Sequence, residues 1–219
     1  MKKCKIVVLI SGFGSNLQAI INQTKSGRLP VEIKAVISNK ADAYGLARAK
    51  KAKIPTEVFS LKDFREKGGY GDSPGGREKA RRAYCTKLSQ IVKKYSPDLV
   101  VLAGWMLVLT NEFLKEFPNR VINLHPALCP AFPGVEGIKQ AYDYGAKVTG
   151  VTVHFVIDEG VDTGPIIIQG PVIIKEGESL ESLEKRIHER EHQILPEAIR
   201  LFTLGKLKIE GRKVEHINS

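Results

Sequence analysis

Two short and almost uninterrupted aliphatic runs constrain the fold of this chain more than any other feature. Residues 5–10 read KIVVLI and residues 98–103 read DLVVLA. Runs of this length without polar alternation are typical of strands that are buried on both faces of a parallel sheet. The segments between and after them alternate between extended and helical patterns, which indicates a doubly wound α/β fold.

The remaining elements follow from periodicity and from glycine and proline positions. We predict three further strands in the first part of the chain, at residues 32–38, 56–59 and 120–124. We predict helices at residues 16–23, 43–53, 77–95 and 111–117. The polar, glycine-rich residues 61–76 are predicted to form a mobile loop.

The pattern changes after about residue 148. Two strands, at residues 148–157 and 166–174, flank a loop rich in Asp and Gly, which predicts an antiparallel addition. A long helix over 179–204 and a hairpin over 207–217 follow. The sequence therefore predicts one α/β domain with a Rossmann-like, mostly parallel twisted sheet, helices on both faces and a C-terminal antiparallel extension.

Composition narrows the class of protein. Apolar residues make up 42% of the 219 positions, which is enough for one core, and no apolar run is long enough to span a membrane. Three widely spaced cysteines disfavour a disulfide framework and favour the cytoplasm. The net charge of +10 indicates either an anionic partner or a solvated, basic helix face. The partner would be a nucleic acid or a phosphorylated or polycarboxylate small molecule. Because no nucleic-acid-binding motif accompanies the charge, we expect no nucleic acid.

The first candidate site is the turn SGFGSN, which follows the first strand and opens a helix. Backbone N–H groups at a helix N-terminus bind anions, and Gly12 and Gly14 allow close approach. Ser15 and Asn16 can cap the helix or bond phosphate oxygens. Leu17 occupies the third glycine position of the dinucleotide fingerprint, so a single phosphate is favoured over a pyrophosphate. A plain glycine-rich turn remains the alternative.

The second candidate site is the segment Asn123-Leu124-His125-Pro126, at the carboxyl end of a predicted strand. Residues two apart on a strand point the same way, so an amide and an imidazole would lie together. Such a pair can stabilise an oxyanion and move a proton. A carboxylate from residues 158–165 could face His125 and favour its imidazolium form. A histidine at a strand end and a plain hairpin remain the alternatives.

Three other patterns are interpreted as structural. Residues 188–192, HEREH, match the H-E-x-x-H zinc signature, but the charged variable positions and the lack of a third ligand argue against it. We therefore predict no metal. Cys129 lies four residues after His125, yet small apolar packing is favoured over a Cys–His nucleophile. His154 is interpreted as a structural histidine within a strand.

Several segments together resemble the phosphoribosylglycinamide formyltransferases, within the folate-dependent formyltransferase superfamily. The segments are VVLISGFGSNLQAII, VISNKADAYGLARA, PDLVVLAGWMLVL, VINLHPALCPAFPG, TGVTVHFVIDEGVDTGPIIIQ and REHQILP. The resemblance runs from Ile6 to about Leu207. The Asn-x-His-Pro core with a later Asp is typical of the superfamily, and the Ser-Gly-x-Gly-Ser-Asn turn narrows it to this branch. Leu107, in place of a frequent Arg, and Ala127, in place of a frequent Ser, depart from the pattern.

The resemblance implies a site. Asn123, His125 and Asp162 would be catalytic. Gly14, Ser15, Asn16 and Glu191 would bind the substrate, glycinamide ribonucleotide. The folate would be bound by Arg81, Met106, Leu107, Val108, Leu109, Asn123, Ile157, Asp158 and Asp162. The phosphate would then be held within residues 1–103, and the folate and the catalytic groups within residues 104–219 of the same domain.

The implied reaction is direct formyl transfer from 10-formyltetrahydrofolate to the substrate amine through a tetrahedral intermediate, in a monomer or homodimer. A formyltetrahydrofolate hydrolase and a phosphate-binding α/β module without enzymatic activity are the alternatives. The hydrolase usually carries an N-terminal regulatory domain, whereas the first strand is expected here at Lys5. The binding module would leave Asn123, His125 and Asp162 without a role.

Overall fold

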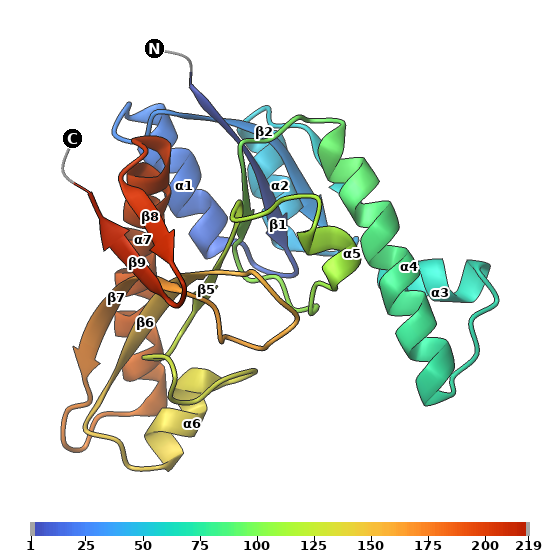
Figure 1. Ribbon diagram of the computed structural model, residues 1–219. Coiled ribbons are helices and arrows are strands. Elements are labelled where there is room, and N and C mark those ends of the chain that lie inside the picture. Colours follow the sequence, from blue (N-terminus) through green and yellow to red (C-terminus); the bar gives the residue numbers. More distant parts are fainter. Residues whose placement is uncertain (1–2, 218–219) are drawn as a thin grey trace. The chain divides into compact units, whose positions relative to one another are not determined.

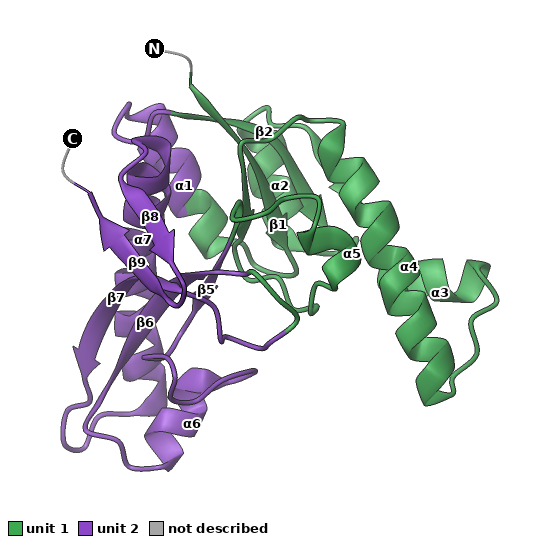
Figure 2. Ribbon diagram, viewed as in Figure 1, with its two compact units in different colours: residues 1–18, 31–121, 157–159 green, residues 19–30, 122–156, 160–219 purple. Residues whose placement is uncertain are grey.

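The structure, a computed structural model, describes residues 3–217. The chain forms two compact units, each assembled from separate stretches of sequence (Figures 1 and 2). Unit 1 comprises residues 1–18, 31–121 and 157–159, and unit 2 comprises residues 19–30, 122–156 and 160–219. Each unit is described by itself below.

Unit 1 is built on four parallel strands in the order β3-β2-β1-β4. The strands are β1 (Cys4–Ile10), β2 (Val31–Ser38), β3 (Thr56–Val58) and β4 (Leu99–Leu102). The central strands β1 and β4 are almost fully buried, as their aliphatic runs predict. The chain moves outward from β1 to β2 and β3 and then returns to the other side of β1. This reversal makes the carboxyl ends of β1 and β4 a topological switch point, where open α/β sheets bind ligands.

The helices of unit 1 confirm most of the predictions. They are α2 (Tyr44–Lys51), α3 (Leu61–Lys67), α4 (Pro74–Lys93) and α5 (Asn111–Leu114), and α1 (Ser15–Lys25) follows β1. The predicted loop over residues 61–76 is wrong, because it contains α3 and the start of α4. Ser60 caps α3 by accepting a hydrogen bond from the Asp63 N–H, and Phe64 packs edge-on against Phe59 and Tyr84. A capping serine and one aromatic anchor therefore outweigh the polar composition of this segment.

Unit 2 contains three antiparallel strands, β5 (Val121–His125), β6 (Val148–Phe155) and β7 (Ile166–Ile173). Helix α7 (Leu180–Thr203) packs on β6 and β7, and a hairpin of β8 (Leu207–Glu210) and β9 (Lys213–His216) follows it (Figure 1). These elements confirm the predicted antiparallel addition. Helix α6 (Gly137–Asp143) was not predicted, because its seven residues carry no strong periodicity. No helix within residues 3–217 has the length and apolarity needed to span a membrane.

The pairing of β6 with β7 generates a stability prediction. A Cβ atom at Gly150 would lie 2.2 Å from the Gly170 carbonyl oxygen and 2.8 Å from Leu128. We expect Gly150→Ala to lower the free energy of unfolding by about 1–3 kcal/mol, since the neighbouring backbone must shift. Gly75→Ala, where nothing lies within 4 Å, is the matched control and should not destabilise. Equal denaturant midpoints for the two variants would contradict the close packing.

Candidate functional site

The predicted phosphate-binding turn lies at the switch point of unit 1. Gly14 has φ +73°, and a Cβ atom there would lie 2.7 Å from the Gly45 Cα, so both conformation and space require glycine. The Ser11 N–H donates to the Gly104 carbonyl at 2.9 Å, and the Met106 N–H donates to the Ser11 hydroxyl at 2.9 Å. The turn after β1 is therefore bonded to the segment after β4.

The side chains after β4 divide into exposed and buried ones. Met106 and Val108 are 60% and 38% exposed, and Ile157 is 42% exposed. Met106 and Val108 follow β4 at the ligand-binding edge, where exposed apolar side chains are suited to a flat aromatic ligand. Leu109, by contrast, is 3% exposed. Its side chain therefore belongs to the core, and only its backbone groups are available to a ligand.

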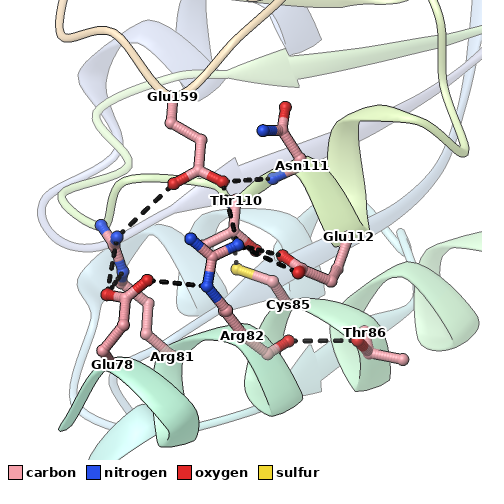
Figure 3. Close-up of polar contacts among 9 residues, drawn as sticks. All are labelled: Glu78, Arg81, Arg82, Cys85, Thr86, Thr110, Asn111, Glu112 and Glu159. Carbon is pink, nitrogen blue, oxygen red and sulfur yellow. Dashed lines mark hydrogen bonds and ion pairs between the residues drawn. The ribbon is translucent and has the colours of Figure 1, made fainter. Parts of the chain in front are cut away.

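Arg81 lies in a cluster of charged groups on α4 (Figure 3). Its guanidinium contacts the Glu78 carboxylate at 2.9 Å and the Glu159 carboxylate at 3.6 Å. Glu159 also accepts a hydrogen bond from the Asn111 N–H at 3.0 Å and pairs with Arg82 at 3.3 Å. The cluster ties residues 157–159 to α4 and to the start of α5. It places Arg81, Ile157 and Asp158, predicted to bind folate, in one region of unit 1.

In unit 2 the predicted catalytic residues Asn123, His125 and Asp162 converge. Asn123 and His125 lie on β5, two residues apart as predicted. The Asn123 side-chain amide donates to Asp162 Oδ1 at 3.1 Å, and His125 Nδ1 lies 3.2 Å from Asp162 Oδ2. The Gly134 N–H also donates to Asp162 Oδ2, at 2.8 Å. The sequence could not show that a residue 37 positions after His125 reaches its ring, so this contact is the main finding in unit 2.

Both nitrogens of the His125 ring face hydrogen-bond acceptors. The ring is 3% exposed, and its Nε2 lies 2.7 Å from the Phe132 carbonyl oxygen while its Nδ1 faces the Asp162 carboxylate. Both partners are acceptors only, so both contacts are satisfied only when both ring nitrogens carry protons. Gly137 packs closely against the His125 ring, because a Cβ atom on Gly137 would lie 3.2 Å from His125 Nε2.

His154 is a site residue that the sequence reasoning missed. It lies on β6 directly opposite Asn123, and its side chain is buried. Its Nδ1 contacts the Phe155 carbonyl oxygen at 2.9 Å, and its Nε2 lies 3.3 Å from the Asn123 amide nitrogen and 3.4 Å from Asp162 Oδ1. Its proximity to Asn123 follows from strand register, which is known only once the pairing of β5 with β6 is known.

The Asp162 carboxylate is buried yet favours its charged form. Burial alone would raise its pKa, but hydrogen bonds from His154 and the Gly134 N–H and the charges of the two histidines outweigh burial and lower the pKa. Asp162 also has φ +53°, a left-handed conformation that is uncommon for a residue other than glycine. Backbone strain of this kind is typical of functional sites, where surrounding contacts hold it in place.

Glu191 lies on α7, and its side chain is 4% exposed. Its carboxylate contacts His188 Nδ1 at 3.0 Å, and this contact raises the pKa of His188. The two histidines of the H-E-x-x-H pattern therefore do not share a ligand position, since His188 pairs with Glu191 inside the pattern. Among residues 3–217 no three His, Cys, Asp or Glu side chains are grouped to hold a metal ion.

Comparison with known proteins identifies the family of this chain. The sequence profile of the formyl transferase family matches residues 4–199, and the chain belongs to that family. Similar proteins within it include phosphoribosylglycinamide formyltransferases. The one from Haemophilus influenzae is 42% identical over 206 residues, which cover 94% of this chain and 90% of that protein. The one from Dictyostelium discoideum is 45% identical over 208 residues, which cover 90% of this chain and 97% of that protein.

A solved structure confirms the predicted fold class. The crystal structure of glycinamide ribonucleotide transformylase 1 from Symbiobacterium toebii has a TM-score of 0.88 and 44% identity to this chain. The match covers 99% of this chain and 95% of that one. The resemblance that the sequence motifs indicate is therefore confirmed at the level of family and fold.

The lowered pKa of Asp162 predicts a pH-dependent contribution to stability. The charged carboxylate stabilises the fold above its ordinary pKa of 3.8, and this contribution is lost as the pH falls through the lowered folded-state value. We expect the difference in unfolding free energy between wild type and Asp162→Asn to be largest near pH 7 and to shrink below pH 4.

Urea unfolding at a series of pH values measures this difference. Asp42→Asn, which alters an exposed carboxylate, is the matched control and should leave stability unchanged at every pH. A difference for Asp162→Asn that stays constant down to pH 2 would contradict the ionised, hydrogen-bonded carboxylate.

Proposed function

We propose that this chain transfers a formyl group from 10-formyltetrahydrofolate to the amine of glycinamide ribonucleotide, a step of purine synthesis, by direct acyl transfer. Membership of the formyl transferase family and similarity to phosphoribosylglycinamide formyltransferases over nearly the whole chain support the reaction. The observation that carries it is the buried contact of Asp162 with His125 and Asn123.

The two ligands have suitable groups on the protein. Gly14, Ser15 and Asn16 would hold the substrate phosphate with backbone N–H groups and short polar side chains. The exposed apolar side chains of Met106, Val108 and Ile157 suit the flat pterin of the folate, and the half-buried Leu107 lies between two of them in the chain. Arg81 supplies a cation for a folate carboxylate, and Glu191 an acceptor for the glycinamide part of the substrate.

The protein stabilises the oxyanion that forms when the amine attacks the formyl carbon. The Asn123 amide and a protonated His125 are the two donors. In the structure these donors contact acceptors within the protein, namely Asp162 Oδ1 for Asn123 and the Phe132 carbonyl for His125 Nε2. An oxyanion is a stronger acceptor than a neutral carbonyl, so the developing charge can replace Phe132 as the partner of His125.

The transfer needs no external acid, because the proton that the amine loses equals the proton that folate N10 gains. A C–N bond forms to the substrate amine and the bond from the formyl carbon to folate N10 breaks. The amine loses one proton and N10 gains one. Asp162 holds the His125 ring in place and orders a water for this proton transfer, so it acts as a positioning and electrostatic group.

We also propose the wider setting of the enzyme. The cysteines at positions 4, 85 and 129 form no disulfide with one another, which fits a reducing cytoplasm. The ligands are small molecules, with neither nucleic acid nor membrane as a partner, and the protein acts as a monomer or homodimer. Residues 1–103 would supply the phosphate site, and residues 104–219 would supply most of the folate and catalytic groups.

Folate absorbance tests the reaction. Loss of the formyl group from 10-formyltetrahydrofolate should occur only when glycinamide ribonucleotide is present. Formyl loss with water alone would support the hydrolase instead. No loss under either condition would support a phosphate-binding module and overturn the proposed function.

Removal of either oxyanion donor tests the assignment of the catalytic residues. We expect Asn123→Ala and His125→Ala each to lower kcat by about 100-fold or more, because a preorganised donor to a developing charge is lost. Both variants should remain folded, although loss of one partner of the buried Asp162 lowers the thermal midpoint. His216→Ala, which removes an imidazole from β9, is the matched control. Turnover near the wild-type rate in either donor variant would reject the assignment.

A further inference from the structure

An exposed stack of two aromatic rings and a guanidinium adjoins the glycine-rich turn of unit 1. The rings of Phe13 and Tyr44 stack with their centroids 5.3 Å apart and an interplanar angle of 17°. The Arg48 guanidinium lies 4.4 Å from the Phe13 centroid and 4.9 Å from that of Tyr44. Phe13 and Tyr44 are 66% and 55% exposed, so burial does not explain the stacking of their rings. The stack joins the turn to α2.

Arg48 also forms directed hydrogen bonds with the turn and with α1. Its Nε donates to the Phe13 carbonyl oxygen at 3.0 Å, and its Nη1 donates to Gln18 Oε1 at 3.3 Å. The Phe13 carbonyl shares a planar trans peptide with the Gly14 N–H, so the two groups point in opposite directions. By holding the oxygen, Arg48 directs the Gly14 N–H away from itself.

The backbones of the turn and of α2 are in direct contact beneath this stack. The Gly45 N–H donates to the Gly12 carbonyl oxygen at 3.1 Å. A Cβ atom on Gly45 would lie 2.5 Å from Ile10 Cδ1 and 3.3 Å from the Gly14 Cα. The first turn of α2 is thus a rigid support for the glycine-rich turn, and two carbonyl oxygens of the turn, those of Gly12 and Phe13, bond to α2.

We propose that Arg48, through its stack with Phe13 and Tyr44, is a positioning residue that preorganises the glycine-rich turn for the phosphate of the substrate. The inference rests on the proposed function. An anion site made of peptide N–H groups binds well only if the peptide planes are already oriented, because ordering them on binding lowers affinity. Arg48 fixes the peptide in the middle of the turn by turning its negative end toward α2.

A lysine substitution separates the effect of the shape of the Arg48 guanidinium from the effect of its charge. A lysine at position 48 would keep the positive charge, but one ammonium group cannot reproduce the planar stack together with both directed bonds. If Arg48 acts by positioning, lysine should fail nearly as badly as alanine. If Arg48 acts as a cation on the phosphate, lysine should rescue most of the loss.

Steady-state kinetics of Arg48→Ala and Arg48→Lys test the proposal. We expect both variants to raise KM for glycinamide ribonucleotide roughly tenfold, the effect of losing a charge-assisted hydrogen bond. The kcat value and KM for 10-formyltetrahydrofolate should stay near those of wild type. Lys51→Ala removes one positive charge from the exposed face of the same helix and should change none of these values.

A second measurement does not depend on the formyl transfer. Inorganic phosphate should raise the thermal midpoint of wild type and of Lys51→Ala, and should do so much less for both Arg48 variants. Phe13→Ala, which removes one ring but keeps the carbonyl, should weaken phosphate binding in the same direction. Absence of glycinamide-dependent turnover in wild type, with this phosphate pattern intact, would reject the proposed function and leave the role of Arg48 standing.

Three outcomes would overturn the role of Arg48. The first is an unchanged KM for glycinamide ribonucleotide in Arg48→Ala. The second is a wild-type KM in Arg48→Lys, which would assign the effect to charge. The third is equal phosphate stabilisation of wild type and both Arg48 variants.

Discussion

The chemistry of unit 2 depends on one buried carboxylate. Asp162 accepts hydrogen bonds from the Asn123 amide and the Gly134 N–H, and it faces the rings of His125 and His154. A buried carboxylate is tolerated only when hydrogen bonds and opposite charge replace the lost water, and here both do. The same contacts that keep Asp162 ionised also hold the amide and the imidazole in register. Under the proposed function, stability and catalysis would therefore share one set of interactions.

Much of the fold could be predicted because its determinants are local. The aliphatic runs of β1 and β4 need no partner to be recognised as buried strands. Helix α3 was missed because one serine cap and one packed phenylalanine determine it, and the composition around them suggests a loop. The short α6 was missed because its seven residues are held by their surroundings and not by their own pattern.

The candidate site could be predicted in part for the same reason. Asn123 and His125 are neighbours on one strand, so their pairing follows from the sequence. The approach of Asp162 and His154 depends on strand register and on a left-handed turn, which no local pattern specifies. The stack that joins Arg48 to the glycine-rich turn is equally invisible in sequence, because it connects residues more than thirty positions apart.

The composition of the glycine-rich turn has a consequence for the ligand. No side chain between Ser11 and Asn16 ionises in the physiological range. Under the proposed function, the affinity of these peptide dipoles for the substrate would be governed by the second ionisation of the phosphomonoester, near pH 6. Recognition would then follow the protonation state of the metabolite and not that of the protein.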